Sequence, residues 1–221
     1  GEMGKAAAAT FLQSRMLNRG KGPAVHSLRV QSDRERYHVY MKQVVESQPG
    51  LDIKQAEIVE VRADGGHISQ VVTGLGAVYQ VKTCILATGT YLRGKIFVGD
   101  VSYASGPDGT HAAGPLSDSL RALGIELRRF KTGTPARVHQ DSIDYSQLEV
   151  QGGDEPITPF SFETTGPLEN RKVCYIAYTN ERTHQVIRDN IHRSPLYGGM
   201  IAGIGPPYCA SIDDKVMRFS G

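Results

Sequence analysis

The sequence lacks a membrane-length apolar run, a cysteine pair and a zinc-protease motif, and each absence removes a class of protein. No apolar stretch approaches the roughly 18 residues that a membrane helix needs. The three cysteines, Cys84, Cys174 and Cys209, form no CxxC pair, and the seven histidines form no HExxH. A disulfide framework and a metal site are therefore not expected. A reducing, cytoplasmic setting is the simpler expectation.

The chain also lacks the usual features of a protein start and the glycine-rich turn of dinucleotide-binding proteins. It has no initiator Met and no basic-then-apolar layout of a secretory signal. The Gly-x-Gly-x-x-Gly turn, which cradles a pyrophosphate at a helix N-terminus, occurs nowhere in the chain. If the chain is part of a dinucleotide-handling flavoenzyme, we expect it to be an internal piece of a larger protein, with the principal FAD-binding turn before Gly1.

Charge is present but unevenly distributed. The formal net charge is +2, yet residues 1–42 hold eight Lys or Arg against three acids, and residues 171–218 hold seven against four. Two separated basic zones favour a polyanionic partner such as RNA, whereas each zone taken alone is equally well explained as a solvated surface. Charge alone leaves both interpretations open.

The first half of the chain predicts one helix and a β-rich block. Residues 18–23 are expected to form a loop, and a helix begins near Ser32 or Asp33 and ends at 47–50. Its apolar face recurs at helical spacing, at Tyr37, Tyr40, Met41, Val44 and Val45. The strands that follow are expected at 51–55, 58–61, 68–73 and 77–81, with a hairpin turn at 64–66. Residues 82–89 then read as a buried parallel strand that enters a glycine turn.

The second half predicts a helix at 114–124, a strand at 125–130 and a turn at 131–135. We place a domain boundary at Thr134, so that the predicted domains are 1–134 and 135–221. Beyond it we expect a loop at 151–159, a strand at 173–178, a helix at 180–192 and a glycine-rich loop at 197–208.

This order of elements indicates a fold class. A helix, an antiparallel ribbon, a buried strand and an Ala-Thr-Gly turn are typical of α/β (mixed α+β) flavoproteins of the two-domain, glutathione-reductase-like FAD/NAD type. In that type the turn lies against the dinucleotide, because glycine lets the backbone approach the cofactor. The tripeptide alone is a weak signal.

Six segments, in one order, resemble a single family. They are 17–25 (LNRGKGPAV), 87–96 (ATGTYLRGKI), 130–135 (FKTGTP), 178–184 (YTNERTH), 187–190 (IRDN) before 193–195 (RSP), and 205–219 (GPPYCASIDDKVMRF). Together they span nearly the whole chain and resemble the tRNA uridine 5-carboxymethylaminomethyl modification enzymes, also called the GidA or MnmG family.

The resemblance implies an FAD domain, a second domain inserted into it, and a C-terminal helical region outside this piece. It further implies a cytoplasmic homodimer that acts on tRNA with a folate-binding GTPase partner. Such an enzyme adds a (carboxymethyl)aminomethyl group to the wobble uridine, with a folate as one-carbon donor, FAD for the redox step and NAD(H) as reductant. The piece alone is expected to be inactive.

The resemblance also implies cofactor residues. FAD neighbours are Ile58, Thr88, Gly89, Thr90 and Ala113, although the family usually has Ser where Ala113 stands. The segment matched to NAD comprises Gly205, Pro206, Pro207, Tyr208, Cys209, Ala210, Ser211, Ile212, Asp213, Asp214, Lys215, Val216, Met217, Arg218 and Phe219. Lys215 and Arg218 could meet phosphate there, whereas the alternative is a structural loop followed by an ordinary amphipathic helix.

Cys209 is the candidate catalytic residue. It precedes an expected helix start, which favours a thiolate that could add to the uracil ring; a lone cysteine is otherwise a small buried hydrophobe, as we expect for Cys84 and Cys174. The family shows Arg where Pro207 stands and Pro where Ala210 stands, so a fork-shaped cation is missing. Two alternatives remain: a small-molecule FAD/NAD oxidoreductase, or a non-catalytic tRNA-binding module.

Overall fold

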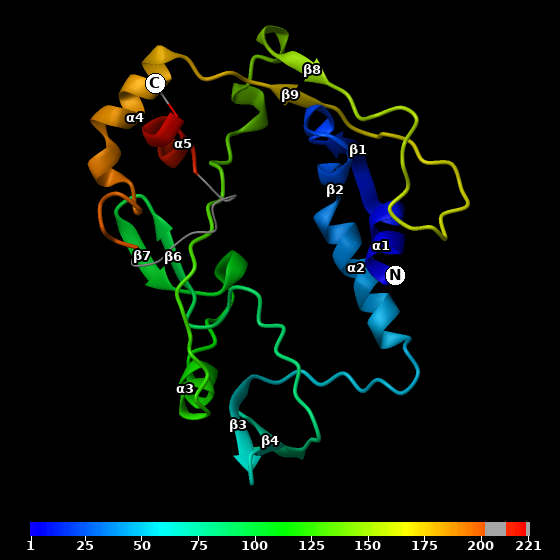
Figure 1. Cartoon of the computed structure of the whole chain (residues 1–221), viewed down its shortest axis with the longest axis vertical. Coiled ribbons are helices and arrows are strands. Elements are labelled where there is room, and N and C mark those ends of the chain that lie inside the picture. Colours follow the sequence, from blue (N-terminus) through cyan, green and yellow to red (C-terminus); the bar gives the residue numbers. More distant parts are fainter. Residues whose placement is uncertain (202–210, 220–221) are drawn as a thin grey trace. The chain divides into compact units, whose positions relative to one another are not determined.

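The computed structural model describes residues 1–201 and 211–219. The chain divides into two compact units (Figure 1). Unit 1 comprises residues 1–53 and 137–178, and unit 2 comprises residues 54–136 and 179–221. Helices and strands are mixed in both, so the predicted α/β (mixed α+β) class is confirmed. The predicted domain boundary at Thr134 stays a prediction.

Unit 1 is built from two antiparallel strand pairs and two helices. Its elements are α1 (Glu2–Thr10), β1 (Phe11–Leu17), β2 (Ser27–Ser32), α2 (Arg34–Glu46), β8 (Glu149–Gln151) and β9 (Cys174–Ile176), with 3-10 turns at Arg19–Lys21, Pro23–Val25, Gln140–Ser142 and Tyr145–Gln147. Both strand pairs, β1–β2 and β8–β9, are antiparallel. The strand predicted at 173–178 is therefore confirmed as β9.

Helix α2 confirms the first predicted helix. Asp33 is its N-cap, and the carboxylate accepts a 3.0 Å hydrogen bond from the backbone N–H of Arg36. The helix ends at Glu46, before the expected 47–50 stop. Its predicted apolar face is half-buried, except for Val45, which is exposed, and α1 packs against the helix.

The β1–β2 hairpin has no counterpart among the predicted strands. The predicted loop at 18–23 connects the two strands, with Asn18 and Gly22 both at positive φ. The outer edge of β1 is bonded by a distant segment, because the Ser14 carbonyl accepts from the backbone N–H of Asp154 and the Ser14 N–H donates to the Asn170 amide oxygen. The hairpin is thus held by unit 1 residues more than 130 positions away in the sequence.

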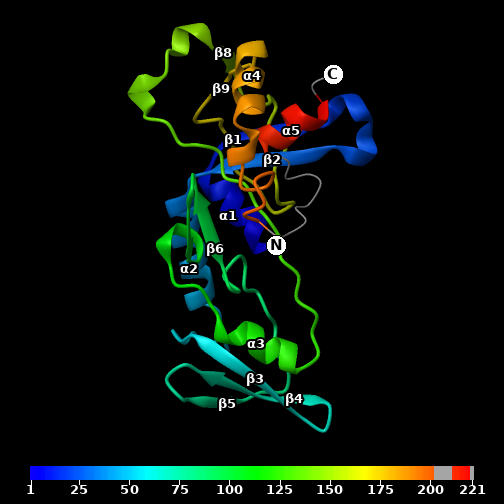
Figure 2. The ribbon, with the colours of Figure 1, turned by 90° about the vertical axis from the view of Figure 1, so that its left-hand side faces the viewer.

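The described residues of unit 2 form a three-stranded meander, a separate hairpin and the helices α3, α4 and α5 (Figure 2). Its elements are β3 (Ile58–Asp64), β4 (His67–Thr73), β5 (Val78–Gln80), β6 (Lys95–Val98), β7 (Val101–Ala104), α3 (Pro115–Ala122), α4 (Glu181–Asp189) and α5 (Ile212–Phe219), with 3-10 turns at Pro107–Gly109 and Ile191–Arg193. The predicted meander is confirmed, including its turn at Gly65 and Gly66, both at positive φ.

Helix α3 packs on β3 and forms the core of unit 2. Leu116 and Leu120 of α3 are buried against Val61 of β3. The Ser119 hydroxyl accepts a 2.9 Å hydrogen bond from the backbone N–H of Val61, which fixes the helix along the strand. The predicted helix at 114–124 is confirmed, with Gly124 at positive φ just past its end.

Three predicted strands are wrong. Residues 51–55, 82–89 and 125–130 are irregular, because a strand requires a neighbour that bonds its backbone and none of the strands in the described ranges pairs with them. The segment 82–89 is also not buried as a whole, since the Ile85 side chain is 91% exposed. Cys84 is half-buried at the edge of the unit 2 core.

The predicted helix at 180–192 is shorter than expected. The Asn180 side chain caps α4 by accepting from the backbone N–H of Thr183 at 3.0 Å. The α-helix ends at Asp189 and is followed by a 3-10 turn that reaches Arg193, so the chain does leave helical geometry before Pro195.

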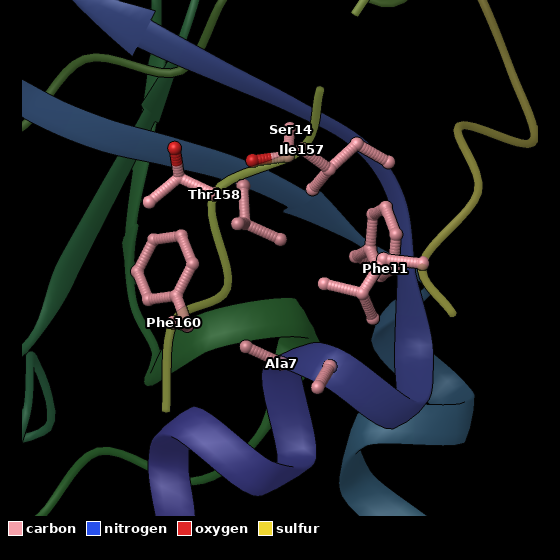
Figure 3. A pocket seen from close by; sticks show the side chains of 9 residues that line it. Ala7, Phe11, Ser14, Ile157, Thr158 and Phe160 are labelled. Carbon is pink, nitrogen blue, oxygen red and sulfur yellow. The ribbon is translucent and has the colours of Figure 1, made fainter. Parts of the chain in front are cut away.

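Unit 1 also holds a small hollow between α1, β1 and a loop (Figure 3). Phe11 and Phe160 face it from the strand and the loop, with Ala7 below. The space is about 10 Å³, which is the room of about one water molecule. Apart from Ser14 and Thr158 its lining is apolar, and the space is too small for a ligand larger than a water molecule.

Candidate functional site: a basic cleft beside a glycine turn

The Thr88-Gly89-Thr90 turn is fixed by hydrogen bonds to its own end and to a distant loop. The Tyr91 backbone N–H donates to the Thr88 carbonyl at 3.0 Å, and Gly89 has φ +51. Ala113 donates to the Tyr91 carbonyl, and Arg93 donates to the Ala113 carbonyl at 2.9 Å. The structure therefore brings the predicted 88–90 turn and Ala113 together.

A glycine after the turn is required by close backbone packing. A Cβ at Gly94 would lie 2.4 Å from the Ser105 carbonyl oxygen and 2.9 Å from that of Thr90. Both contacts are with backbone atoms, which cannot rotate away. Gly94 thus lets the start of β6 pass against the turn, and no larger residue fits without moving it.

Ile58 stabilises the same region indirectly. Its side chain packs against the core formed by Val61, Leu116 and Leu120. That core holds α3, and α3 begins two residues after Ala113. Ile58 therefore contributes to the packing behind the turn.

Next to the turn lies a cleft of about 620 Å³. Gly89 and Thr90 form part of its wall, and the start of α3 contributes Ser117. Its apolar lining comprises Leu92, Phe97, Leu127, Phe130, Met200 and Ile201. Its charged lining comprises the cations Arg93, Lys95, Arg121, Arg128, Arg129 and Lys131, with Glu126 as the acid.

Half of these cations are matched by carboxylates. Arg93 and Arg121 both pair with Asp118, the latter at 3.3 Å. Arg128 pairs with Glu126 at 3.0 Å. These pairs are exposed and so contribute little to stability, but they neutralise part of the local charge.

The other three cations have no carboxylate partner within the described ranges. Arg129 donates to the Arg93 carbonyl at 2.9 Å, and Lys131 donates to the Ser211 hydroxyl at 3.0 Å. The Lys95 ammonium lies 5.2 Å from the centre of the Phe97 ring. The cleft is consequently positive, and its chemistry suits an anionic ligand with apolar parts, such as a dinucleotide.

Ser211 leads into α5, whose first turn is held by a polar network. The Asp214 carboxylate is buried and accepts from the Tyr197 hydroxyl at 2.9 Å and from the Arg218 guanidinium at 2.8 Å. The bond to Asp214 raises the pKa of Arg218, and the same carboxylate raises the pKa of the Tyr197 hydroxyl. The network fixes α5 on the turn that contains Tyr197.

Asp213 is held in a similar way. Burial pushes the pKa of this carboxyl upward, but hydrogen bonds from the Ser194 and Ser211 hydroxyls outweigh burial and leave its pKa below the usual value. The charged form is therefore the stable one. Asp213 connects the start of α5 to the chain that follows α4.

The family model described as Glucose inhibited division protein A matches residues 1–221. The chain belongs to the GidA family. It is 56% identical over 221 residues to the tRNA uridine 5-carboxymethylaminomethyl modification enzyme MnmG of Caldicellulosiruptor saccharolyticus, with 100% of this chain and 35% of that protein covered. It is 54% identical over 220 residues to the protein of the same name from Clostridium kluyveri, with 99% and 35% covered.

A solved GidA structure has the same fold. The form I crystal structure of Aquifex aeolicus GidA matches with a TM-score of 0.88 and 46% identity, covering 100% of this chain and 38% of that chain. This GidA-family chain therefore spans roughly a third of the length of these relatives. The sequence-based assignment to the family is confirmed.

The expected cofactor residues of this GidA-family chain divide into four groups, of which the last, 211–219, leads into and forms α5. Thr88, Gly89, Thr90 and Ala113 lie together, and Gly89 and Thr90 line the cleft. Ile58 lies in the supporting core. The catalytic candidate Cys209 and its neighbours Gly205, Pro206, Pro207, Tyr208 and Ala210 lie outside the described residues.

The segment 211–219 is described, and it forms the lead-in and body of α5. Arg218 is held by Asp214 of its own helix, whereas Lys215 is exposed. Val216 is buried, and Ile212, Met217 and Phe219 are exposed. Of the two cations expected to meet phosphate, Lys215 is the one without an ion pair in the described part of the chain.

Sequence reasoning misses most of the cleft's cations. It assigns residues 128–131 to a strand and a turn, which leaves their charges unconnected with the 88–90 turn. The signal that could have found them is the density of cations between Glu126 and Lys131, three in six residues, where the FKTGTP segment begins. Within the described residues, no group of His, Cys, Asp or Glu could hold a metal ion, and no helix is long and apolar enough to cross a membrane.

Proposed function

We propose that this chain is the central part of an FAD-dependent tRNA-modifying enzyme. In this proposal the intact protein adds a (carboxymethyl)aminomethyl group to the wobble uridine, together with a folate-binding GTPase partner that supplies the one-carbon unit. The observation that carries the proposal is the positive cleft beside the 88–90 turn, in a chain whose relatives are named tRNA uridine modification enzymes.

The cleft's residues suit a part of FAD that is both anionic and aromatic. The glycine at 89 allows close backbone approach, and Arg129 and Lys131 supply charge that no carboxylate in the described ranges neutralises. The apolar lining suits an aromatic ring system. Ala113 lacks the family's hydroxyl, and its backbone N–H and carbonyl are bonded to Tyr91 and Arg93, so in this proposal it positions the turn. The flavin, when bound, supplies the redox step, and the protein binds and orients it.

We place the NAD(H) contact on the segment 205–219. Lys215 is exposed on α5, and the network of Asp213, Asp214 and Tyr197 holds that helix in one position. NAD(H), when bound, supplies the hydride that reduces the flavin. In the described part of this segment, the chain's role is to hold α5 and to present Lys215 to an anion.

Cys209 is the proposed nucleophile toward the wobble uracil. Its thiolate would add to the ring and so activate the neighbouring carbon for one-carbon attack. We further propose that the intact enzyme is a cytoplasmic homodimer, as the family resemblance implies. Since this chain spans about a third of its relatives, the activity is assigned to the intact protein and not to this piece.

The test uses the intact protein. We expect a stoichiometric flavin absorbance spectrum, reduction of the flavin by NADH, and modified wobble uridine by mass spectrometry of tRNA nucleosides. Cys209→Ser should retain flavin and its reduction by NADH but lose modification. An intact protein that oxidises NADH without binding tRNA is instead a small-molecule oxidoreductase, and one that binds tRNA without flavin is a binding module.

A further inference from the structure

The β1–β2 hairpin in unit 1 is basic and contains no acid of its own. Residues 11–32 hold four cations, Arg15, Arg19, Lys21 and Arg29, and neither Asp nor Glu. Asp154 is the carboxylate that meets it: the same oxygen accepts from Arg19 at 2.7 Å and from the Met16 backbone N–H at 2.6 Å. Across the described residues, the other three cations make no ion pair.

Two of these cations lie directly opposite each other. Arg15 and Arg29 are cross-strand partners in the antiparallel register, which places their Cβ atoms about 5 Å apart on one face. Like charges in this arrangement destabilise a hairpin. The next row on that face is neutral, because Gln13 and Gln31 accept hydrogen bonds there from the Cys174 thiol. An anion between the two guanidiniums would remove the repulsion.

The tip of the hairpin is fixed and exposed. The Asn18 side chain donates to the Val25 carbonyl at 3.1 Å, and Gly22 has φ +90 ahead of Pro23. Lys21 is exposed at this tip, which extends away from α1 and α2 (Figure 2). Arg19, Lys21 and Arg29 are exposed and Arg15 is half-buried, so the cations are spaced along a ribbon whose turn is held by its own hydrogen bonds.

The surface chemistry favours a polyanion over a protein partner. Val25 is the one large apolar residue of the hairpin that is highly exposed, at 46%. Protein interfaces bury aromatic and aliphatic anchors, which this ribbon does not offer. Guanidinium forks match phosphate oxygens in pairs, and a row of cations follows a phosphate backbone.

We propose that the β1–β2 hairpin binds the phosphate backbone of RNA. Arg15 and Arg29 clamp one phosphate from both sides, and Lys21 meets a second phosphate beyond the tip. The inference rests on the proposed function for the identity of the RNA as tRNA. The hairpin is the structural element that holds the RNA phosphate backbone, and its residues are separate from the cleft residues that we assign to FAD.

The experiment measures binding of an unmodified tRNA transcript to the intact protein at several salt concentrations. The double variant Arg15→Gln, Arg29→Gln should weaken affinity about tenfold per guanidinium. The slope of log affinity against log salt should fall by about one for each phosphate that is no longer bound. The matched control is Arg62→Gln on strand β3, because Arg62 is an exposed arginine that is already paired with Glu60 at 2.9 Å.

Two further variants separate a binding effect from a folding effect. Lys21→Gln changes an exposed side chain without any described contact and should reduce the salt slope even if the double variant fails to fold. Arg15→Lys with Arg29→Lys keeps both charges but removes the fork, so the slope should remain while affinity falls. Flavin content and circular dichroism should be unchanged in the variants that support the proposal.

Each other outcome overturns the inference. If the intact wild type does not bind tRNA, the proposed function fails and this inference fails with it. If the wild type binds and the double and Lys21 variants bind equally well with the same slope, the hairpin inference alone is wrong. If the variants instead change the oligomeric state or lose a protein partner while keeping tRNA affinity, the hairpin is a protein interface.

Discussion

The cleft of unit 2 and the hairpin of unit 1 are both basic, but their charge is organised differently. In the cleft, the two carboxylates of Asp118 and Glu126 pair with three of the six cations, and a glycine turn and apolar side chains shape the space. In the hairpin, Asp154 offsets one cation, and the charge lies on an open ribbon. A shaped and partly neutralised site suits one ligand of defined form, whereas an open positive ribbon suits a repeating polyanion.

The largest effect expected is from Gly94→Ala, which would break the cleft and leave the hairpin intact. The new Cβ would lie 2.4 Å from the Ser105 carbonyl oxygen, so the backbone must move. We expect loss of flavin from the intact protein and about 1–3 kcal/mol lower stability, by thermal unfolding. Gly133→Ala is the control, since a Cβ there meets nothing within 4 Å. Equal flavin retention in both variants would contradict the role of Gly94.

A smaller effect is expected from removing single cleft cations. Arg129→Gln or Lys131→Met should weaken flavin binding about tenfold, because neither cation is neutralised by a carboxylate in the described ranges. Arg128→Gln should matter less, since Arg128 is already paired with Glu126. Flavin fluorescence, followed during release and rebinding of the cofactor, measures the flavin affinity of all three variants. A larger loss in Arg128→Gln than in Lys131→Met would reverse the assignment.

The helix that follows the hairpin can be weakened without changing any of the hairpin's four cations. Asp33→Ala removes the N-cap of α2, directly after β2, and should cost about 1 kcal/mol. Denaturant unfolding of the intact protein, followed by hydrogen exchange in residues 34–37, measures the loss. Ser47→Ala at the other end of the helix is the control, because its hydroxyl makes no hydrogen bond within the described residues. If the two variants unfold alike, the cap does not stabilise the helix.

The smallest effect concerns acid pH. The pKa of Asp213 is lowered in the folded protein, so its contribution is present above the unfolded value of 3.8 and is lost as pH falls through the lower folded value. Exchange in α5 should therefore increase below about pH 4, and Asp213→Asn should show part of this loss already at neutral pH. The β1–β2 hairpin, which carries no carboxylate of its own, should not respond through its own residues.

Short-range sequence patterns predicted the elements that are marked by a helix cap or a glycine turn. Asp33 and Asn180 are caps that start α2 and α4, and Gly65 with Gly66 marks the β3–β4 turn. These signals act within a few residues, so they can be read from the sequence directly. The helix predicted at 114–124 was found for the same reason, and its Leu116 and Leu120 lie in the buried core.

Non-local structure escaped prediction. The segment around Ile85 reads as a buried strand, yet strand formation depends on a partner that no local pattern reveals. The β1–β2 hairpin depends on edge bonds from Asp154 and Asn170, which lie far along the chain. The cleft likewise joins the 88–90 turn to Lys131 and Ser211 through folding alone, so its cations could not be grouped beforehand.

Asp118 has a consequence for charge balance. As the counter-ion of both Arg93 and Arg121, it leaves the cleft, together with Glu126, with two carboxylates against six cations, a formal excess of four. A pyrophosphate is a dianion, so a bound dinucleotide would leave the region cationic. The electrostatic potential around the cleft would therefore stay positive after the flavin binds. A bound flavin would then not repel a second polyanion such as RNA through long-range electrostatics.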